Sequence, residues 1–148
     1  MSTQAIVDLL PYTAPFLFVD ELLRVDADGA EGVFTFRSEL EFYKGHLKEK
    51  PITPGVLLTE CCAQIGLVCL GIFLLQDTNR NTKVNIGMSS SQMEFLKPVL
   101  PDETVRVVSK KIYFRFHKLK CDVRMYNSKE ELVCKGILSG MILNDTNE

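Results

Sequence analysis

The sequence predicts an α+β fold in which an antiparallel sheet of about six strands covers one long apolar helix. Residues 56–75 are apolar or small on nearly every side of a helix, which is typical of a helix buried all round. Residues 119–125 alternate apolar and charged side chains, the pattern of a strand with one face in water. With 148 residues, we expect residues 1–148 to form one domain that buries about 68% of its unfolded surface.

The composition is that of an ordinary soluble protein, with 46% apolar residues, 24% charged residues and a net charge of −2. This charge predicts neither nucleic acid nor a membrane surface as a partner. The N-terminus lacks a basic and apolar signal peptide, so we expect a cytoplasmic protein. The five cysteines show no paired spacing and are expected to be reduced and buried. With two histidines and no Cys-x-x-Cys motif, no metal site is expected.

Before the long helix, the pattern indicates a short first helix and two strands. Residues 3–10 predict the helix, which Pro11 ends. Residues 16–25 are strand-like, residues 26–29 carry a turn signal, and residues 31–37 alternate as a second strand.

After the helix, residues 84–88 and 93–96 predict extended chain on either side of three serines, and residues 98–103 predict a loop with two prolines. Beyond Val105 and Val107 the apolar residues move to the other parity, which predicts a bulge or a bend in a long strand. The members of this second set are Val108, Ile112, Phe114 and Phe116.

The last two strands are expected around a hairpin and a pair of glycines. His117 is expected at the tip of a hairpin, as a solvated turn residue. Residues 132–143 predict the final strand, in which Gly136 and Gly140 allow close approach of a neighbouring element.

The start of the long helix carries the candidate chemistry. Thr53 is expected as the N-cap and Pro54 as the first helical residue. Glu60 and Gln64 follow on one face, one turn apart, which argues for a core helix instead of a membrane span. Burial raises the pKa of a carboxyl group, which makes Glu60 a candidate general acid. His46 lies 14 residues before Glu60, although a surface histidine and a structurally paired glutamate would explain the same pattern.

This segment resembles the signature of the FabZ/FabA-type 3-hydroxyacyl-acyl carrier protein dehydratases. The shared features are a Gly-His pair, a short loop, a Pro-Gly-Val-Leu run, an acidic residue and an Ala-Gln pair. In this chain they are Gly45-His46, Pro51, Pro54-Gly55-Val56-Leu57, Glu60 and Ala63-Gln64. The resemblance extends to Leu10-Pro11 and residues 15–20 upstream, and to residues 95–99 and 101–102 downstream. It implies the hotdog fold.

The resemblance also implies the reaction, which is loss of water from a 3-hydroxyacyl thioester to give a trans-2-enoyl thioester. His46 is then the base for the C2 proton and Glu60 the acid for the C3 hydroxyl group. The amide of Gly55, in the first helical turn, is the expected donor to the thioester oxygen. We expect the Val56 carbonyl to orient His46 and Gln64 to hold Glu60. The family implies no cofactor of its own, and a homodimer or a trimer of dimers whose sites are shared between chains.

The partner implied is an acyl carrier protein, which presents the acyl thioester on a phosphopantetheine arm. Between Arg106 and Arg124 there are seven basic residues and one acidic residue. This stretch is either a solvated strand face or a docking surface for an acidic carrier. The candidate docking residues are Lys110, Lys111 and Arg115. The candidate tunnel residues, which are otherwise core residues, are Phe16, Phe18 and Phe95.

Three departures from the family pattern leave the acid, the base and the amide donor in place. Leu47-Lys48 stands where Phe-Pro is usual, Tyr12-Thr13 where His-Arg is usual, and Thr53 where a bulky residue is usual. They put the substrate preference in doubt and are compatible with a specialised pathway to a secondary lipid or a polyene. A hotdog thioesterase and a non-catalytic partner subunit are the alternatives, because one fold hosts several functions.

Overall fold

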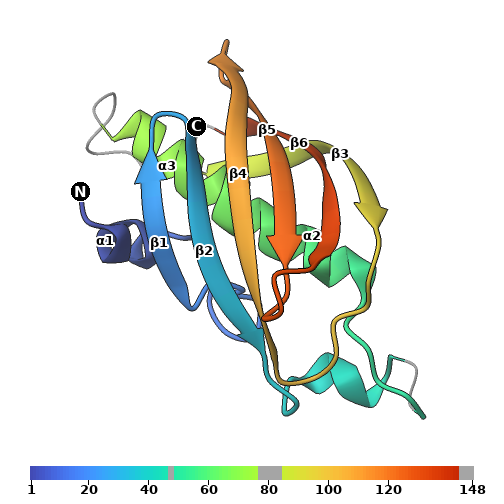
Figure 1. Ribbon diagram of the computed structural model, residues 1–148. Coiled ribbons are helices and arrows are strands. Elements are labelled where there is room, and N and C mark those ends of the chain that lie inside the picture. The colour runs from blue at the N-terminus through green and yellow to red at the C-terminus, as the bar shows by residue number, and fades with distance from the viewer. Residues whose placement is uncertain (47–48, 77–84, 144–148) are drawn as a thin grey trace.

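The computed structural model describes residues 1–46, 49–76 and 85–143, and shows a curved six-stranded antiparallel sheet around one long helix (Figure 1). The strand order is β1-β2-β4-β5-β6-β3. The strands are β1 (Glu21–Asp26), β2 (Gly29–Phe36), β3 (Asn85–Phe95), β4 (Glu103–Arg115), β5 (Lys118–Tyr126) and β6 (Leu132–Leu143). A short helix α1 (Thr3–Asp8) precedes the sheet, and a single 3₁₀ turn η1 (Glu41–Lys44) follows β2. The predicted α+β hotdog architecture is confirmed.

The long helix is one continuous rod with a wider turn in its middle. It consists of α2 (Gly55–Ala63), a π-helical turn η2 (Gln64–Val68) and α3 (Cys69–Leu75). Its length and composition would allow it to cross a membrane, but 78% of its most apolar stretch is buried inside the protein. The helix therefore serves as the core element on which the sheet packs, and the five cysteines are buried with it or in the strands that contact it.

Two predictions about the start of this helix are wrong. Thr53 does not cap it: Pro54 occupies the N-cap position, and Thr53 is buried with its hydroxyl turned to another partner. The helix is also not buried all round, because Val56 in its first turn is 76% exposed. Full burial begins one turn later, at Cys61 and Cys62.

The strands differ from the prediction mainly at their ends and breaks. β1 begins at Glu21, because residues 16–20 form an irregular segment. The two extended stretches expected around the serines form one strand, β3, with a bulge between Met88 and Ser90. Val84, which was expected to begin this strand, lies outside the described residues.

The predicted change of face in β4 is confirmed. Alternate residues up to Ser109 point into the core, and the register with β5 shifts between Lys111 and Tyr113. Ile112 lies in this bulge and is half exposed, whereas Phe114 beyond it packs against the core. Phe116 does not belong to the strand face: it is 89% exposed and forms the β4–β5 turn with His117, both residues having positive φ.

β5 and β6 follow the predicted patterns. The apolar residues of β5 are buried and its charged residues face outward. A Cβ atom on Gly140 would lie 2.8 Å from Leu67 of the long helix, which explains why a glycine is needed at this point of β6.

Candidate active site

Gln64 is the structural centre of the candidate site. Its side chain is fully buried at the start of the π-helical turn. Its carbonyl oxygen accepts the backbone N–H of Phe18 at 2.8 Å. Because that oxygen is an acceptor, the amide nitrogen must be the atom that donates to the Phe16 carbonyl and to the Glu60 carboxylate, both at 3.0 Å. The segment before β1 is thereby tied to the helix that carries the acidic residue.

Glu60 lies one turn before Gln64 and is partly buried. Burial raises the pKa of its carboxyl group, while the hydrogen bond from Gln64 lowers the pKa in part. Such a group keeps its proton to a higher pH than an exposed glutamate, as a general acid requires. The Gln64 amide also fixes the direction in which the carboxyl group points.

The start of α2 offers free backbone donors beside an aromatic ring. The amides of Leu57 and Leu58 are both bound to the Pro54 carbonyl. In the described part of the chain, the amides of Gly55 and Val56 have no backbone acceptor. A Cβ atom on Gly55 would lie 3.3 Å from two carbons of the phenyl ring of the last residue of β3, so this ring packs directly on the glycine. The helix start can therefore receive an oxygen atom with partial negative charge.

His46 lies directly after η1 and Gly45, and it is held at two points. Its backbone N–H donates to the Phe42 carbonyl at 3.1 Å, and its ring Nδ1 lies 2.9 Å from the Ile52 carbonyl oxygen. The expectation that the Val56 carbonyl orients this ring is wrong, because Ile52 supplies the oxygen. A carbonyl only accepts, so Nδ1 carries the proton and Nε2 is left with a free lone pair. His46 is thus prepared to accept a proton at Nε2.

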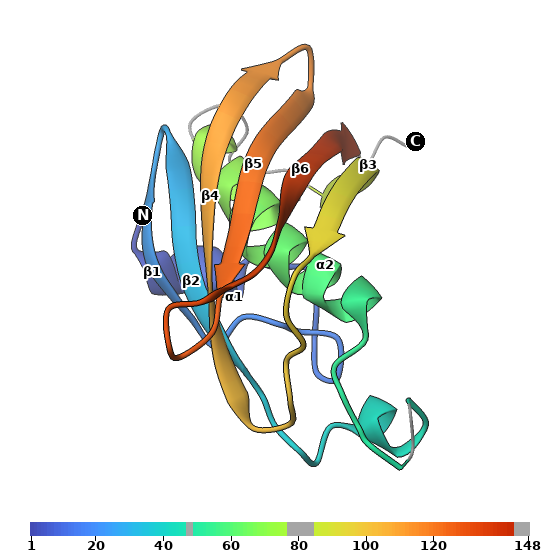
Figure 2. The ribbon, with the colours of Figure 1, turned by 45° about the vertical axis from the view of Figure 1, so that its right-hand side comes forward.

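Within one chain, the base and the acid are not in contact. No hydrogen bond or ion pair joins His46 to Glu60 among the described residues. In both ribbon views η1 projects beyond the end of the sheet, away from the body of the protein (Figure 2). Glu60, by contrast, lies on the helix that the sheet covers. One chain therefore carries both candidate groups but does not bring them together.

The three candidate tunnel residues have different environments. Phe18 is buried among the core aromatics, whereas Phe16 and Phe95 are 47% and 48% exposed. The rings of Phe16 and Phe18 meet edge to face at 5.2 Å between centroids. An aromatic path thus leads from the surface to the peptide groups that Gln64 holds.

Tyr12 belongs to this aromatic path, although sequence reasoning noted it only as a departure from the family pattern. Its ring lies 6.1 Å from that of Phe16. Burial, and then the neighbouring Glu60 carboxylate, raise the pKa of Tyr12 to about 12, so its hydroxyl remains protonated at neutral pH.

The candidate docking residues Lys110, Lys111 and Arg115 lie toward the far end of β4 from η1 (Figure 1). The guanidinium group of Arg115 lies 4.2 Å from the ring centroid of Tyr113. None of the three forms an ion pair with a carboxylate in the described part of the chain.

At its two ends, the positive charge of the basic stretch is partly neutralised by ion pairs. Arg106 pairs with Glu31 and Glu130 across neighbouring segments, and Arg124 pairs with Asp122 at 3.6 Å. The free positive charge is therefore concentrated around the β4–β5 hairpin.

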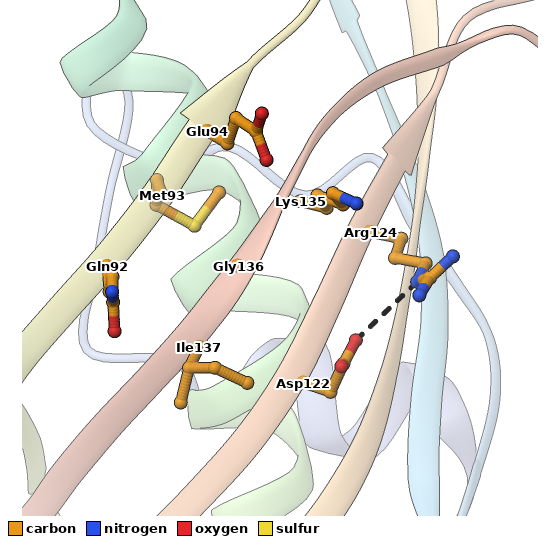
Figure 3. A pocket seen from close by; sticks show the side chains of 8 residues that line it. All are labelled: Gln92, Met93, Glu94, Asp122, Arg124, Lys135, Gly136 and Ile137. Atoms are coloured by element: carbon orange, nitrogen blue, oxygen red, sulfur yellow. Dashed lines mark ion pairs between the residues drawn. The ribbon is translucent and has the colours of Figure 1, made fainter.

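An open groove of about 460 Å³ lies elsewhere, on the outer side of the sheet over β3, β5 and β6 (Figure 3). Its lining includes Glu94, Lys135 and the Asp122–Arg124 ion pair. Asp122 and Arg124 alternate with buried residues of β5, so this side of the sheet faces away from the helix. The groove contains none of the candidate catalytic residues. No cluster of three His, Cys, Asp or Glu side chains able to hold a metal ion is found among the described residues.

The fold and the site geometry can now be compared with known proteins. In two solved structures the fold recurs at low sequence identity. The dehydratase heterocomplex ApeI:P from Xenorhabdus doucetiae matches with a TM-score of 0.78 at 12% identity, over 94% of this chain and 91% of that one. The thioesterase HI1161 from Haemophilus influenzae matches with a TM-score of 0.69 at 11% identity, over 100% and 94%. The structural likeness therefore shows the fold and does not choose between the two activities.

Sequence comparison is more specific. The FabA-like domain matches residues 10–134. The 3-hydroxyacyl-[acyl-carrier-protein] dehydratase FabZ of Sinorhizobium medicae is 33% identical over 145 residues, which cover 95% of this chain and 89% of that protein. The chain belongs to the FabA-like family and is a FabZ-like hotdog dehydratase.

Proposed function

We propose that this protein removes water from a 3-hydroxyacyl thioester carried on acyl carrier protein, in the biosynthesis of fatty acids or related lipids. The observation that supports this most directly is that one side chain is held as a proton donor and another as a proton acceptor. Glu60 is held by Gln64 where burial favours its protonated form, and His46 is tethered through Nδ1 so that Nε2 is free. An acid and a base at neutral pH are what elimination of water requires.

In the proposed mechanism, Nε2 of His46 takes a proton from C2 of the acyl chain. Negative charge then moves onto the thioester oxygen, where the free amides of the first turn, Gly55 foremost, stabilise it. Glu60 gives its proton to the C3 hydroxyl group, the C3–O bond breaks and water leaves. The product is the trans-2-enoyl thioester, and a proton must pass from His46 back to Glu60 before the next turnover.

We further propose that the active site is shared between two chains. One chain leaves His46 and Glu60 apart, and among the described residues the outer edge of β3 has no neighbouring strand. β3 has 11 residues, no proline and a single charged residue, Glu94, whereas edge strands are usually protected by charges, prolines or short length. Pairing with a second copy would cover this edge. The assembly we propose is therefore at least a homodimer, and a trimer of dimers remains the alternative.

A complementation experiment tests the shared site. His46→Ala and Glu60→Gln proteins are purified separately, then mixed under conditions that exchange subunits. If the site is shared, each mixed dimer has one site with both intact side chains and one site with neither, so part of the activity should return. Mixtures that stay inactive after exchange has been demonstrated would place both residues in one chain or in different functions.

Three finer proposals accompany this function. Residues 1–148 work as one dehydratase domain in the cytoplasm, without a cofactor of their own. The thioester arrives on the phosphopantetheine arm of the carrier, with Phe16, Phe18 and Phe95 beside its acyl chain. The acidic carrier docks on Lys110, Lys111 and Arg115.

The function is tested by incubating the protein with carrier-bound 3-hydroxyacyl thioesters of several chain lengths and following the products by mass. Loss of one water from the intact thioester supports dehydration. Release of the free acid would show a hotdog thioesterase instead, and no turnover at any chain length would favour a non-catalytic partner subunit. The preferred chain length also separates ordinary fatty-acid synthesis from a specialised lipid or polyene pathway. His46→Ala and Glu60→Gln should each lower turnover by about 10²–10⁴.

A further inference from the structure

One peptide group connects the histidine loop to the body of the protein. The bond between Ile52 and Thr53 uses both of its polar atoms: the carbonyl accepts from Nδ1 of His46 at 2.9 Å, and the N–H donates to the Val99 carbonyl at 2.9 Å. Val99 is fully buried in the loop before β4. The orientation of this single peptide plane therefore decides where the oxygen that holds the histidine ring lies.

A buried side-chain pair fixes the same peptide from one side. The Thr53 hydroxyl is hydrogen-bonded to the Tyr43 hydroxyl. Both residues are buried, with 4% and 5% of their surface exposed. Burial raises the pKa of Tyr43, so its hydroxyl stays neutral and available as a donor. Because an unpaired buried hydroxyl is costly, the pair holds the two segments together.

The pair also spans the histidine. Tyr43 lies in η1, three residues before His46, and Thr53 follows the carbonyl that the histidine contacts. The His46 N–H is also bound to the Phe42 carbonyl, which holds the start of this segment. The hydroxyl pair thus closes the loop that carries the proposed base, at a position where the family usually has a bulky residue.

We propose that Tyr43 and Thr53 are positioning residues for the proposed dehydration: their hydroxyl pair orients the Ile52–Thr53 peptide, and that peptide sets the tautomer of His46. This inference rests on the proposed role of His46 as the base. Neither side chain touches the substrate. With the pair intact, Nδ1–H of His46 is tethered and Nε2 accepts the substrate proton. Without it, only the Thr53 N–H bound to Val99 holds the peptide, so the carbonyl can tilt away from Nδ1 and the imidazole loses its fixed tautomer.

The test uses variants that delete one hydroxyl each, Tyr43→Phe and Thr53→Val, together with the double variant. Each single variant should lower kcat by about 10-fold with little change in KM, because a slightly misplaced base weakens the transition state and not substrate binding. The double variant should be no worse than either single one, since all three remove the same bond. Thr53→Ser keeps a hydroxyl group and should restore most of the rate.

The second readout does not depend on activity. The chain contains only two histidines, so ¹⁵N spectra of labelled protein show His46 beside His117, which lies in the exposed β4–β5 turn and serves as an internal reference. In the intact protein His46 should show the Nδ1–H tautomer. In Tyr43→Phe and Thr53→Val its signals should move toward the mixture of tautomers of free imidazole, while those of His117 stay unchanged.

Matched controls come from the same residue types elsewhere. Tyr126→Phe changes a tyrosine on β5 whose ring contacts Arg106, and Thr104→Val breaks a hydroxyl pair with Thr35 on the outer side of the sheet. Both should leave kcat and the His46 signals unchanged. If Tyr43→Phe and Thr53→Val behave like these controls, the inference is wrong. An intact protein without dehydratase activity would overturn the proposed function, and the tautomer measurement would still decide the role of the pair.

Discussion

Gln64→Met tests the central hydrogen-bond network by removing the amide while keeping an unbranched side chain of similar length. The largest loss is the bond to the Phe18 N–H, which becomes an unpaired buried donor. That loss costs about 1–3 kcal/mol, and the bonds to the half-exposed Phe16 carbonyl and the partly buried Glu60 add smaller amounts. Part of this is offset because methionine is readily buried. We expect the free energy of unfolding to fall by about 3 kcal/mol.

For a chain of 148 residues, a loss of ~3 kcal/mol lowers Tm by roughly 6–12 °C. Thermal and urea unfolding measure this directly, and the slope of the urea transition should not change. Gln92→Met on exposed β3 makes the same chemical change without a buried network, and should shift Tm very little. A Gln64→Met protein that melts within the error of the Gln92→Met protein would refute the reasoning.

Three further predictions follow from the site. Glu60→Gln should stabilise the protein at pH 7 but not at pH 4. Burial raises the pKa of Glu60 in the folded state above its value in the unfolded chain, so the unmodified protein loses stability as the pH rises from the unfolded pKa to the folded pKa. Tm measured at both pH values reports the difference. Gly55→Ala should lower kcat clearly while changing Tm little, because the added Cβ atom would lie 3.3 Å from the phenyl ring at the end of β3, beside the free amides. Measuring kcat and Tm on the same protein separates the two effects. Changing Lys110, Lys111 and Arg115 together to Glu should raise KM for carrier-bound substrate and leave turnover of a short free thioester unchanged. Added salt should reduce the difference in KM between the variant and the unmodified protein, because it screens the charges.

The fold was largely predictable because its strongest signals are local. The apolar run of the long helix, the alternation in β5 and the change of face in β4 each reflect the periodicity of one element. The errors fall where tertiary contacts override that periodicity. The three serines interrupt the apolar pattern of this stretch, yet β6 pairs along β3 and the irregularity is a bulge between Met88 and Ser90.

The candidate site was predictable as a set of residue types but not as a set of contacts. The spacing of Glu60 and Gln64 on one helical face predicted their hydrogen bond, which the structure contains. No periodicity relates His46 to Ile52, because the loop between them has none, so the carbonyl that holds the ring was assigned to the wrong residue. Thr53 carried a usable signal: it departs from the bulky residue that is usual there, and its hydroxyl group is used by Tyr43 and not as a helix cap.

One of the two errors in the helix prediction is informative about the assembly. The apolar pattern of the long helix predicts burial all round, yet Val56 in the first turn is 76% exposed and Phe95 beside it is 48% exposed. Large apolar side chains grouped at an exposed surface are typical of an interface. The same turn must keep its amides open to receive a thioester oxygen, so the chain's own sheet cannot seal it. A second chain that covers these side chains, while leaving a channel to the amides, satisfies both requirements. In the dimer proposed above, the helix would be buried on all sides, as its apolar pattern predicts, although its first turn is exposed in a single chain.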